Sequence, residues 1–236
     1  MKLSAMLAAI MTVTALTAPV RASSAAVAAD TKSTDRHSWY CKNNDSQTPP
    51  ELPSEFSFIK ENGGYYLDEK ATEDRKVIYL TFDAGYENGN IEKILDILKQ
   101  HNAPGAFFVL GNLITRNTEL VKRMVDEGHL VCNHTNRHHD MSKVTDSTAF
   151  MAELEALNTI MKETCGSEIA PFYRPPEGRF SEEKALNKLL THTHNGEVLL
   201  LHPTSATNAA ILDAYLTKLE AEGYTFGTLY ELTAEG

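Results

Sequence analysis

Polar side chains able to do catalytic chemistry follow several apolar stretches that are typical of buried strands. They are Asp83 after Val77–Phe82, His134 after Leu130–Asn133, Arg174 after Phe172–Tyr173, and His202 after Val198–Leu201. His138 lies four positions beyond His134, a spacing that lets two imidazoles reach one metal ion. A carboxylate can act as a base, an imidazole can bind a metal or carry a proton, and a guanidinium can hold an anion.

Each of these residues also has a structural interpretation. Asp83 can cap the turn after its strand, and His134 and His138 can be ordinary loop residues. Arg174 can serve as an ion-pair partner and His202 as a buried core histidine. Because functional groups gather at the carboxyl ends of parallel strands, the shared placement favours one site over these separate explanations. The remaining histidines considered lack that placement and are interpreted as structural or solvated: His129, His139, His192 and His194.

The elements that must position these residues alternate along the chain from Lys76 onward. Ile91, Ile94, Leu95 and Leu98 follow the i, i+3, i+4, i+7 spacing of one helix face. Similar stripes predict helices near 120–125, 151–161, 181–192 and 211–219, between strands at 77–82, 105–110, 130–133, 172–173, 198–201 and 224–226. Short connections between strands and helices predict an α/β domain with a parallel sheet, either open or closed as a barrel.

Composition and the N-terminal region narrow the class of protein. The chain has 236 residues, is 42% hydrophobic and carries a net charge of −10, which argues against nucleic acid as a partner. Lys2 precedes an uncharged run, and small-residue cleavage patterns follow, so residues 1–29 are predicted to be a secretory signal peptide. Cleavage would leave no stable membrane span and an exported, secreted or cell-surface protein; a retained membrane anchor is the alternative.

Residues 30–70 are predicted to form an extended polar arm, which Trp39 and Tyr40 could dock onto a catalytic domain at residues 71–236. The three cysteines are Cys41, Cys132 and Cys165. An odd count leaves at least one unpaired, and their spacing is not that of a metal site, so we assign them no chemistry.

Four motifs in a fixed order carry a family resemblance, and together they extend over most of the chain from Lys76. They are TFDAGYENG, NHTNRHHDM, YRPPEGRF and LLLH. This set resembles the polysaccharide deacetylase family, carbohydrate esterase family 4. The TFDAGYENG form, with Trp39 upstream, is most similar to the branch that de-N-acetylates muramic acid during spore cortex δ-lactam formation. The resemblance implies a deformed (β/α) barrel and a hydrolase acting on N-acetyl groups of cell-wall peptidoglycan.

Carried over residue by residue, the resemblance implies metal-assisted hydrolysis. Asp83 would be the general base, Arg174 would hold it as a carboxylate, and His202 would protonate the departing amine. His134 and His138 would bind a divalent ion such as Zn, Mn or Co. Tyr173 and Pro175 would contact the substrate, with the Tyr173 backbone N–H a candidate oxyanion donor.

Two departures from the family pattern qualify this expectation. Ala84 stands where the family usually has a second, metal-binding aspartate, so metal affinity should be lower, and Glu87 is the nearest carboxylate that could replace it. Arg174 and His202 are only 28 positions apart. A βα unit of roughly 30 residues is therefore expected to be missing there, leaving the barrel one unit short. Two alternatives stay open: a weakly active or inactive glycan-binding remnant, and a deacetylase of another N-acetylated polysaccharide.

Overall fold

A computed structural model describes residues 47–52, 54, 57–61, 64–141, 144, 146–176 and 193–234. They belong to one compact unit, Asp35–Gly236. The predicted signal peptide and the predicted helix at 181–192 lie outside the described residues, as do Trp39, Tyr40 and Cys41. Among the described helices, none combines the length and apolar character needed to cross a bilayer.

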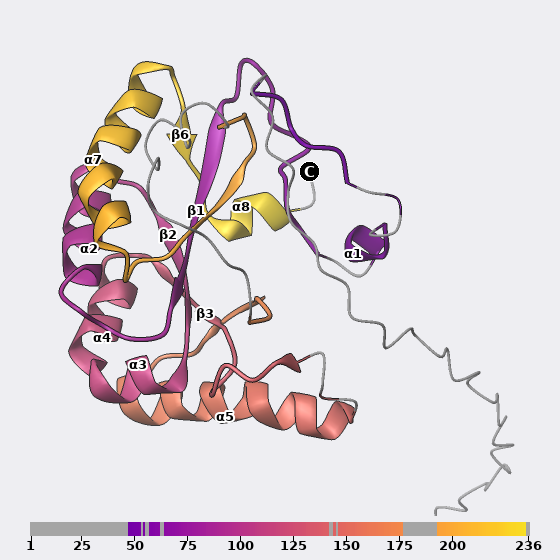
Figure 1. The fold of residues 1–236 in the computed structure, drawn as a ribbon, viewed down its shortest axis with the longest axis vertical. Coiled ribbons are helices and arrows are strands. Elements are labelled where there is room, and N and C mark those ends of the chain that lie inside the picture. The colour runs from indigo at the N-terminus through magenta and orange to yellow at the C-terminus, as the bar shows by residue number, and fades with distance from the viewer. Residues whose placement is uncertain are drawn as a thin grey trace, which may run out of the picture. The chain divides into compact units, whose positions relative to one another are not determined.

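The described strands form one sheet in which every named strand pair is parallel, as the sequence predicts (Figure 1). Its central path runs β4-β3-β2-β1-β5, and β6 also pairs with β1. The strands are β1 (Val77–Ala84), β2 (Gly105–Val109), β3 (Leu130–Asn133), β4 (Ala170–Tyr173), β5 (Val198–Leu201) and β6 (Thr225–Phe226). The parallel α/β arrangement is confirmed.

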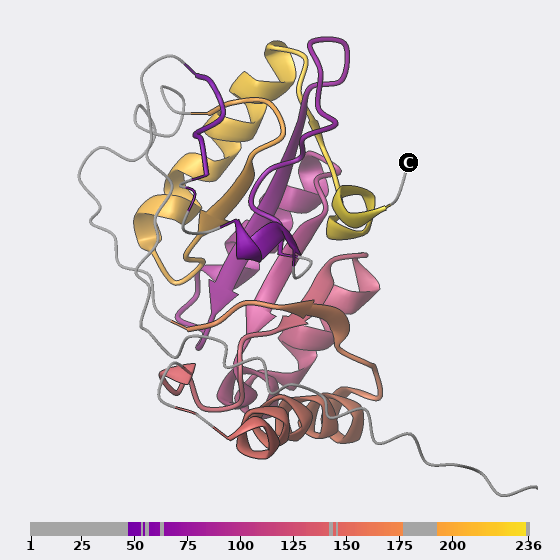
Figure 2. The same ribbon diagram turned by 90° about the vertical axis from the view of Figure 1, so that its right-hand side faces the viewer.

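The longer helices lie on one face of this sheet (Figures 1 and 2). They are α2 (Ile91–Gln100), α4 (Thr118–Asp126), α5 (Ser147–Cys165) and α7 (Ala206–Ala221). Three short helices were not expected from the sequence: α1 (Phe58–Glu61), α3 (Gly111–Arg116) and α8 (Leu229–Thr233). Each has too few residues to show a full helical stripe of apolar positions.

Strand β1 separates two hydrophobic clusters because its side chains alternate between the faces of the sheet. Ile78, Leu80, Phe82 and Ala84 belong to a helix-side cluster, whereas Val77 and Tyr79 belong to an inner cluster that also contains Phe108 and Cys132. Alternation therefore places Thr81 and Asp83 on the inner face.

The strand also extends two residues beyond its predicted end, so Asp83 lies within β1 and not after it. Pairing of Asp83 with Phe108 and of Ala84 with Val109 in β2 explains the extension.

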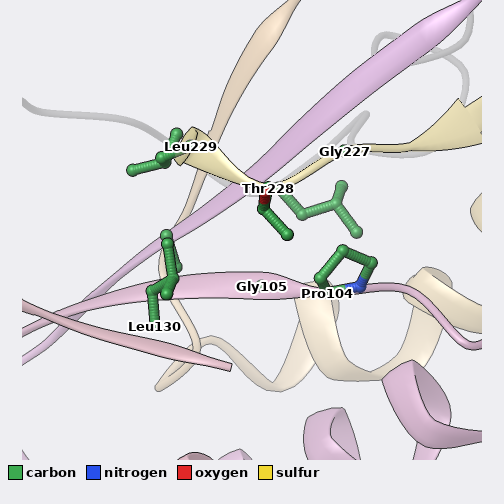
Figure 3. Close-up of a pocket in the computed structure, with 8 residues that line it drawn as sticks. Pro104, Gly105, Leu130, Gly227, Thr228 and Leu229 are labelled. Carbon is green, nitrogen blue, oxygen red and sulfur yellow. The ribbon is translucent and has the colours of Figure 1, made fainter. Parts of the chain in front are cut away.

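One edge of β1 is shared by two strands. β6 pairs with Val77 and Ile78, while the pairing with β2 begins at Leu80. Figure 3 shows Pro104 and Gly105 facing Gly227, Thr228 and Leu229 where the two strands meet. A side chain at Gly227 would place its Cβ 2.6 Å from Cε1 of Tyr79, so glycine is required for this close approach.

The end of the predicted arm is bound to the domain by a buried carboxylate. Asp68 is 4% exposed, accepts hydrogen bonds from the Tyr79 hydroxyl (2.6 Å) and Arg75 (2.8 Å), and also accepts from the backbone of Lys70. These bonds hold the pKa of Asp68 below its usual value against the opposing effect of burial, which is the largest single influence. Position 70 is the predicted boundary between the arm and the catalytic domain. Residues on both sides of it therefore pack together.

The two ends of the strand order are β4 and β5, which do not pair with each other in the described part of the chain. We call the space between them the β4–β5 seam. Leu200 of β5 pairs with Thr81 and so shares its inner face, yet is 40% exposed. The seam lies between the strands that lead into Arg174 and His202.

Candidate active site

The carboxylate of Asp83 is held from one side by Arg174. Nη1 of Arg174 donates to Oδ1 of Asp83 at 2.8 Å, and both side chains are largely buried, at 21% exposure for Arg174 and 14% for Asp83. The guanidinium carbon also lies 4.2 Å from the centre of the Phe108 ring. The ion pair with Oδ1 of Asp83 and the contact with the Phe108 ring together fix the guanidinium of Arg174 in place.

Thr81 gives Arg174 a second anchor. Its hydroxyl accepts from Nη2 of Arg174 at 2.7 Å and donates to the carbonyl of Leu199 at 2.7 Å. The residue is fully buried and stands two positions before Asp83, on the same strand face. Sequence analysis missed Thr81 and Phe108. The period of two along β1 is the signal that could have identified Thr81.

His134 faces the second oxygen of Asp83. Its Nε2 lies 3.9 Å from Oδ2, and its Nδ1 lies 2.9 Å from the backbone carbonyl of Arg174. A carbonyl only accepts hydrogen bonds, so Nδ1 carries the proton and Nε2 presents a lone pair toward Asp83. Burial lowers the pKa of His134, although Asp83 and the carbonyl of Arg174 oppose that shift. The imidazole is therefore neutral near pH 7.

His138 lies beside His134 in a tight loop. The two rings meet edge to face with centroids 5.2 Å apart. Thr135 and His138 both have positive φ angles, 74° and 58°, and the Thr135 hydroxyl accepts from the backbone N–H of His138 at 2.9 Å. Asn133 begins the loop and accepts from the backbone N–H of Thr135. The loop therefore turns back on itself, and the His138 ring comes to lie against the His134 ring.

His202 comes directly after β5, whose last residue, Leu201, pairs with Phe82. This register places the backbone of His202 beside that of Asp83. Its carbonyl accepts from Ser205 and from the Asn208 side chain, which fixes the start of α7. Asn88 and Asn90 of the β1–α2 loop both donate to the carbonyl of Thr204, tying the two loops together.

Tyr173 and Pro175, expected to contact the substrate, flank Arg174. The Tyr173 ring meets Phe150 of α5 edge to face at 5.7 Å, and burial raises its pKa to about 12. Pro175 is exposed. The ring of Tyr173 therefore contacts α5 on one side but remains 36% exposed.

Neither Ala84 nor Glu87 supplies the missing carboxylate ligand. The side chain of Ala84 is fully buried in the helix-side cluster, on the opposite face from Asp83. Glu87 accepts from the backbone N–H groups of Gly89 and Ile91, so it caps the start of α2. Within the described residues, no three His, Cys, Asp or Glu side chains form a cluster able to hold a metal ion.

The donor set at His134 nevertheless fits a cation. A lone pair of Nε2 and an unpaired oxygen of Asp83 face each other, and two acceptors in this position suit a positive ion between them. The bond from Nδ1 to a backbone carbonyl is the orienting contact that metal-binding histidines commonly make. His134 and His138 are thus the residues that would hold a metal, next to the carboxylate of Asp83.

Comparisons with known proteins show the family of this chain. The sequence profile of the polysaccharide deacetylase family matches residues 70–194. An uncharacterised 30.6 kDa protein of Geobacillus stearothermophilus is 35% identical, over 84% of this chain and 85% of its own. The peptidoglycan-N-acetylmuramic acid deacetylase PdaA of Bacillus subtilis is 32% identical, over 84% of this chain and 86% of its own.

The solved structure of Bacillus subtilis PdaA, a family 4 carbohydrate esterase, is also similar. It aligns with a TM-score of 0.78 at 30% identity, covering 85% of this chain and 98% of that one. The fold described above is therefore shared with a structurally characterised deacetylase.

Proposed function

Because this chain belongs to the polysaccharide deacetylase family, we propose that it is an exported hydrolase that removes the acetyl group from N-acetylmuramic acid residues of peptidoglycan, in δ-lactam formation of the spore cortex. The name of the similar Bacillus subtilis enzyme supports muramic acid as the substrate. The predicted signal peptide, outside the described residues, supports export to the cell wall.

The base in this reaction is Asp83. Arg174 binds Oδ1, so Oδ2 remains available to take a proton from the attacking water. Water adds to the acetyl carbonyl carbon, the C–N bond then breaks, and acetate and a free amine are the products. Arg174 keeps the carboxylate correctly oriented, because its guanidinium is fixed by Thr81 and Phe108.

A divalent metal ion held by His134 and His138 would polarise the acetyl carbonyl and the water. The neutral state of His134 suits this role, because a protonated imidazole has no free lone pair. Zn, Mn and Co are the candidate ions. The alanine at position 84 leaves the site without one carboxylate ligand, so weak binding is expected.

His202 is the proposed acid. Its backbone lies beside that of Asp83 across the β1–β5 pair, on the opposite side of β1 from His134, and from there an imidazole would protonate the leaving nitrogen. Tyr173 and Pro175 are kept as proposed substrate contacts, through the backbone at the end of β4.

The single observation that carries the proposal is the contact of Asp83 with Arg174 on one oxygen and His134 on the other. The test is acetate release by the purified protein from muramic-acid-containing glycan, with and without added divalent metal. Metal-stimulated release supports the proposal. A stable, folded protein that releases no acetate with any of the three metals contradicts it.

The β4–β5 seam favours a second candidate, a weakly active or inactive glycan-binding remnant. The alignment with the Bacillus subtilis enzyme spans 229 positions but uses 84% of this chain, about 198 of its 236 residues. About 30 positions therefore have no counterpart, which supports a missing βα unit. Glycan binding without acetate release would decide for this candidate, and release only from other N-acetylated polysaccharides would indicate a different substrate.

A further inference from the structure

A second concave surface lies next to the proposed catalytic loop. This pocket has a volume of about 410 Å³ and is bordered by the start of α3, the loop between His134 and His138, and α5. Asn112, Asn136, Arg137 and Ile160 are among the residues that line it. We call it the loop pocket. The catalytic residues described above do not line it.

The loop pocket adjoins the reacting groups through the backbone. Arg137 directly precedes His138, so the Cα atoms of these residues are about 3.8 Å apart. On the other side, the backbone N–H of Leu110 donates at 3.3 Å to the carbonyl of Ala84, the residue after Asp83. The loop pocket is therefore joined through the backbone to the segments that carry His138 and Asp83.

The charge of the loop pocket differs from that of the whole molecule. Arg137 is the one charged residue among the described residues that line it, in a protein with a net charge of −10. Glu153 contacts this loop through its carboxylate, which accepts from the backbone N–H of Arg137 at 2.7 Å. Glu153 belongs to α5, and its bond to the backbone of Arg137 fixes the loop. Arg137 itself is exposed.

The backbone around Arg137 is held on both sides. The N–H of Gly111 donates to the carbonyl of Asn136 at 3.1 Å, and a Cβ at Gly111 would lie 2.1 Å from Oδ1 of Asn136. Glycine at position 111 thus makes room for the amide of Asn136 at the pocket wall. Arg137, Asn112 and Asn136 line the same pocket, and a guanidinium on a fixed loop is suited to bind a carboxylate with paired hydrogen bonds.

From this arrangement we propose that Arg137 and the loop pocket recognise a carboxylate on the sugar next to the acetamido group. The lactyl ether of muramic acid carries such a carboxylate, which N-acetylglucosamine lacks. The assignment rests on the proposed function, and it identifies what would select one amino sugar over the other. Arg137 is a specificity-determining residue in this role, separate from the steps of hydrolysis.

The test compares two ligands and three proteins. The ligands are N-acetylmuramic acid and N-acetylglucosamine, which differ in the lactyl group. The proteins are the Asp83→Asn protein, which is expected to be inactive, and the same protein with Arg137→Ala or Arg116→Ala added. Arg116 is an exposed arginine of α3 that does not line the pocket, so its variant matches the change in charge. Dissociation constants are measured by NMR titration at low salt.

Arg137→Ala is expected to weaken N-acetylmuramic acid binding by roughly tenfold, the typical effect of losing one charge-assisted contact. Binding of N-acetylglucosamine and both affinities of the Arg116→Ala protein should change less than about twofold. Added salt should weaken N-acetylmuramic acid binding only where Arg137 is present. Equal losses for both ligands, no loss, or no preference for N-acetylmuramic acid in the parent protein would overturn the assignment.

The same variants separate this inference from the proposed function. In the parent sequence, acetate release is measured from muramic-acid-containing glycan and from a neutral chitooligosaccharide. If neither is hydrolysed but the NMR preference depends on Arg137, the pocket assignment stands and the hydrolase proposal fails. If the muramic-acid glycan is hydrolysed and Arg137→Ala changes neither its KM nor ligand binding, the hydrolase proposal stands and the pocket assignment fails.

Discussion

The two oxygens of Asp83 lie in different surroundings, and that asymmetry gives the residue its chemistry. Oδ1 is bonded to Arg174, whereas Oδ2 faces a lone pair of His134 at 3.9 Å. A structural cap would use its oxygens on backbone N–H groups, as Glu87 does at the start of α2. The side chain of Asp83 instead contacts other polar side chains at the carboxyl end of the sheet.

Replacing Asp83 with asparagine should remove activity while preserving the fold. The amide cannot accept a proton from water, so acetate release should fall by at least about 100-fold, the lower range of general base effects. The measurement is the initial rate at saturating metal, with circular dichroism as the check on folding. A folded variant within about threefold of the parent rate would exclude Asp83 as the base.

Thr81→Val should lower kcat without removing the catalytic carboxylate. The buried hydroxyl that receives Nη2 of Arg174 is lost, so the guanidinium loses one of its two polar anchors and the orientation of Asp83 becomes less fixed. A decrease of roughly tenfold in kcat is expected, together with about 1–3 kcal/mol of destabilisation.

Thr81→Ser is the matched control, because it keeps the hydroxyl and should recover most of the rate. A loss of kcat in Thr81→Ser as large as that in Thr81→Val would show that keeping the hydroxyl is not enough, and would contradict this role for its bond to Arg174.

Metal removal should inactivate the protein reversibly. Two imidazoles without a carboxylate ligand make a weaker cation site than the usual mixed set. Dialysis against a chelator should abolish acetate release, and Zn, Mn or Co should restore it. The metal content of the dialysed protein is measured alongside its activity. Full activity of metal-free protein would contradict the assignment of His134 and His138 as ligands.

At the scale of elements, a buried acid that the proposed hydrolysis does not use directly precedes β5. Glu197 precedes β5, and its backbone carbonyl accepts from the N–H of Tyr79. One oxygen of its carboxylate is buried without a hydrogen-bond partner among the described residues. Burial raises the pKa of Glu197 to about 7, although a hydrogen bond with the backbone of His194 opposes the shift.

This raised pKa predicts how stability changes with pH. The folded state favours the protonated acid, so the stabilisation is fully present below about pH 4.5, the unfolded value, and is lost as the pH rises toward 7. The loss is roughly 3 kcal/mol at most.

Glu197→Gln should remove that dependence, so the variant should gain stability relative to the parent at pH 7.5 and change little at pH 4. Urea unfolding at both values measures the difference. A parent and variant with parallel pH profiles would contradict the raised pKa.

At the scale of the whole molecule, the β4–β5 seam is the main structural difference expected from the missing βα unit. In the described residues, β4 pairs only with β3 and β5 pairs only with its β1 neighbour. Open strand edges favour association with other chains, and exposed apolar residues such as Leu200 lose burial. We therefore expect marginal stability, aggregation or dependence on a partner, and slow turnover.

Inserting the corresponding βα segment of the Bacillus subtilis enzyme between Arg174 and His202 should raise Tm and reduce aggregation. A gain of several kcal/mol is expected if a few hundred Å² of apolar surface becomes buried, at about 25 cal/mol per Å². Thermal unfolding and light scattering of both proteins provide the measurement. If the natural chain already unfolds cooperatively between about 45 and 65 °C and releases acetate at an ordinary rate, the seam is not a defect.

The sequence by itself determined the order of strands and long helices, the identity of the polar residues at strand ends, and the family. Those features are local: helical stripes, apolar runs and motif letters are visible without knowing what lies across the sheet. The same reasoning placed Asp83 after its strand and missed α3 and α8, because pairing with β2 extends β1 and six or five residues show no full helical period.

Only the tertiary structure decided which atoms meet. That Arg174 takes one oxygen of Asp83, that Thr81 supports it, and that Ala84 points into the helix-side cluster all follow from strand register. The burial that makes His134 neutral and raises the pKa of Glu197 also comes from residues distant in sequence. Register and burial are sums over contacts between separate segments, so they exist only once the chain has folded.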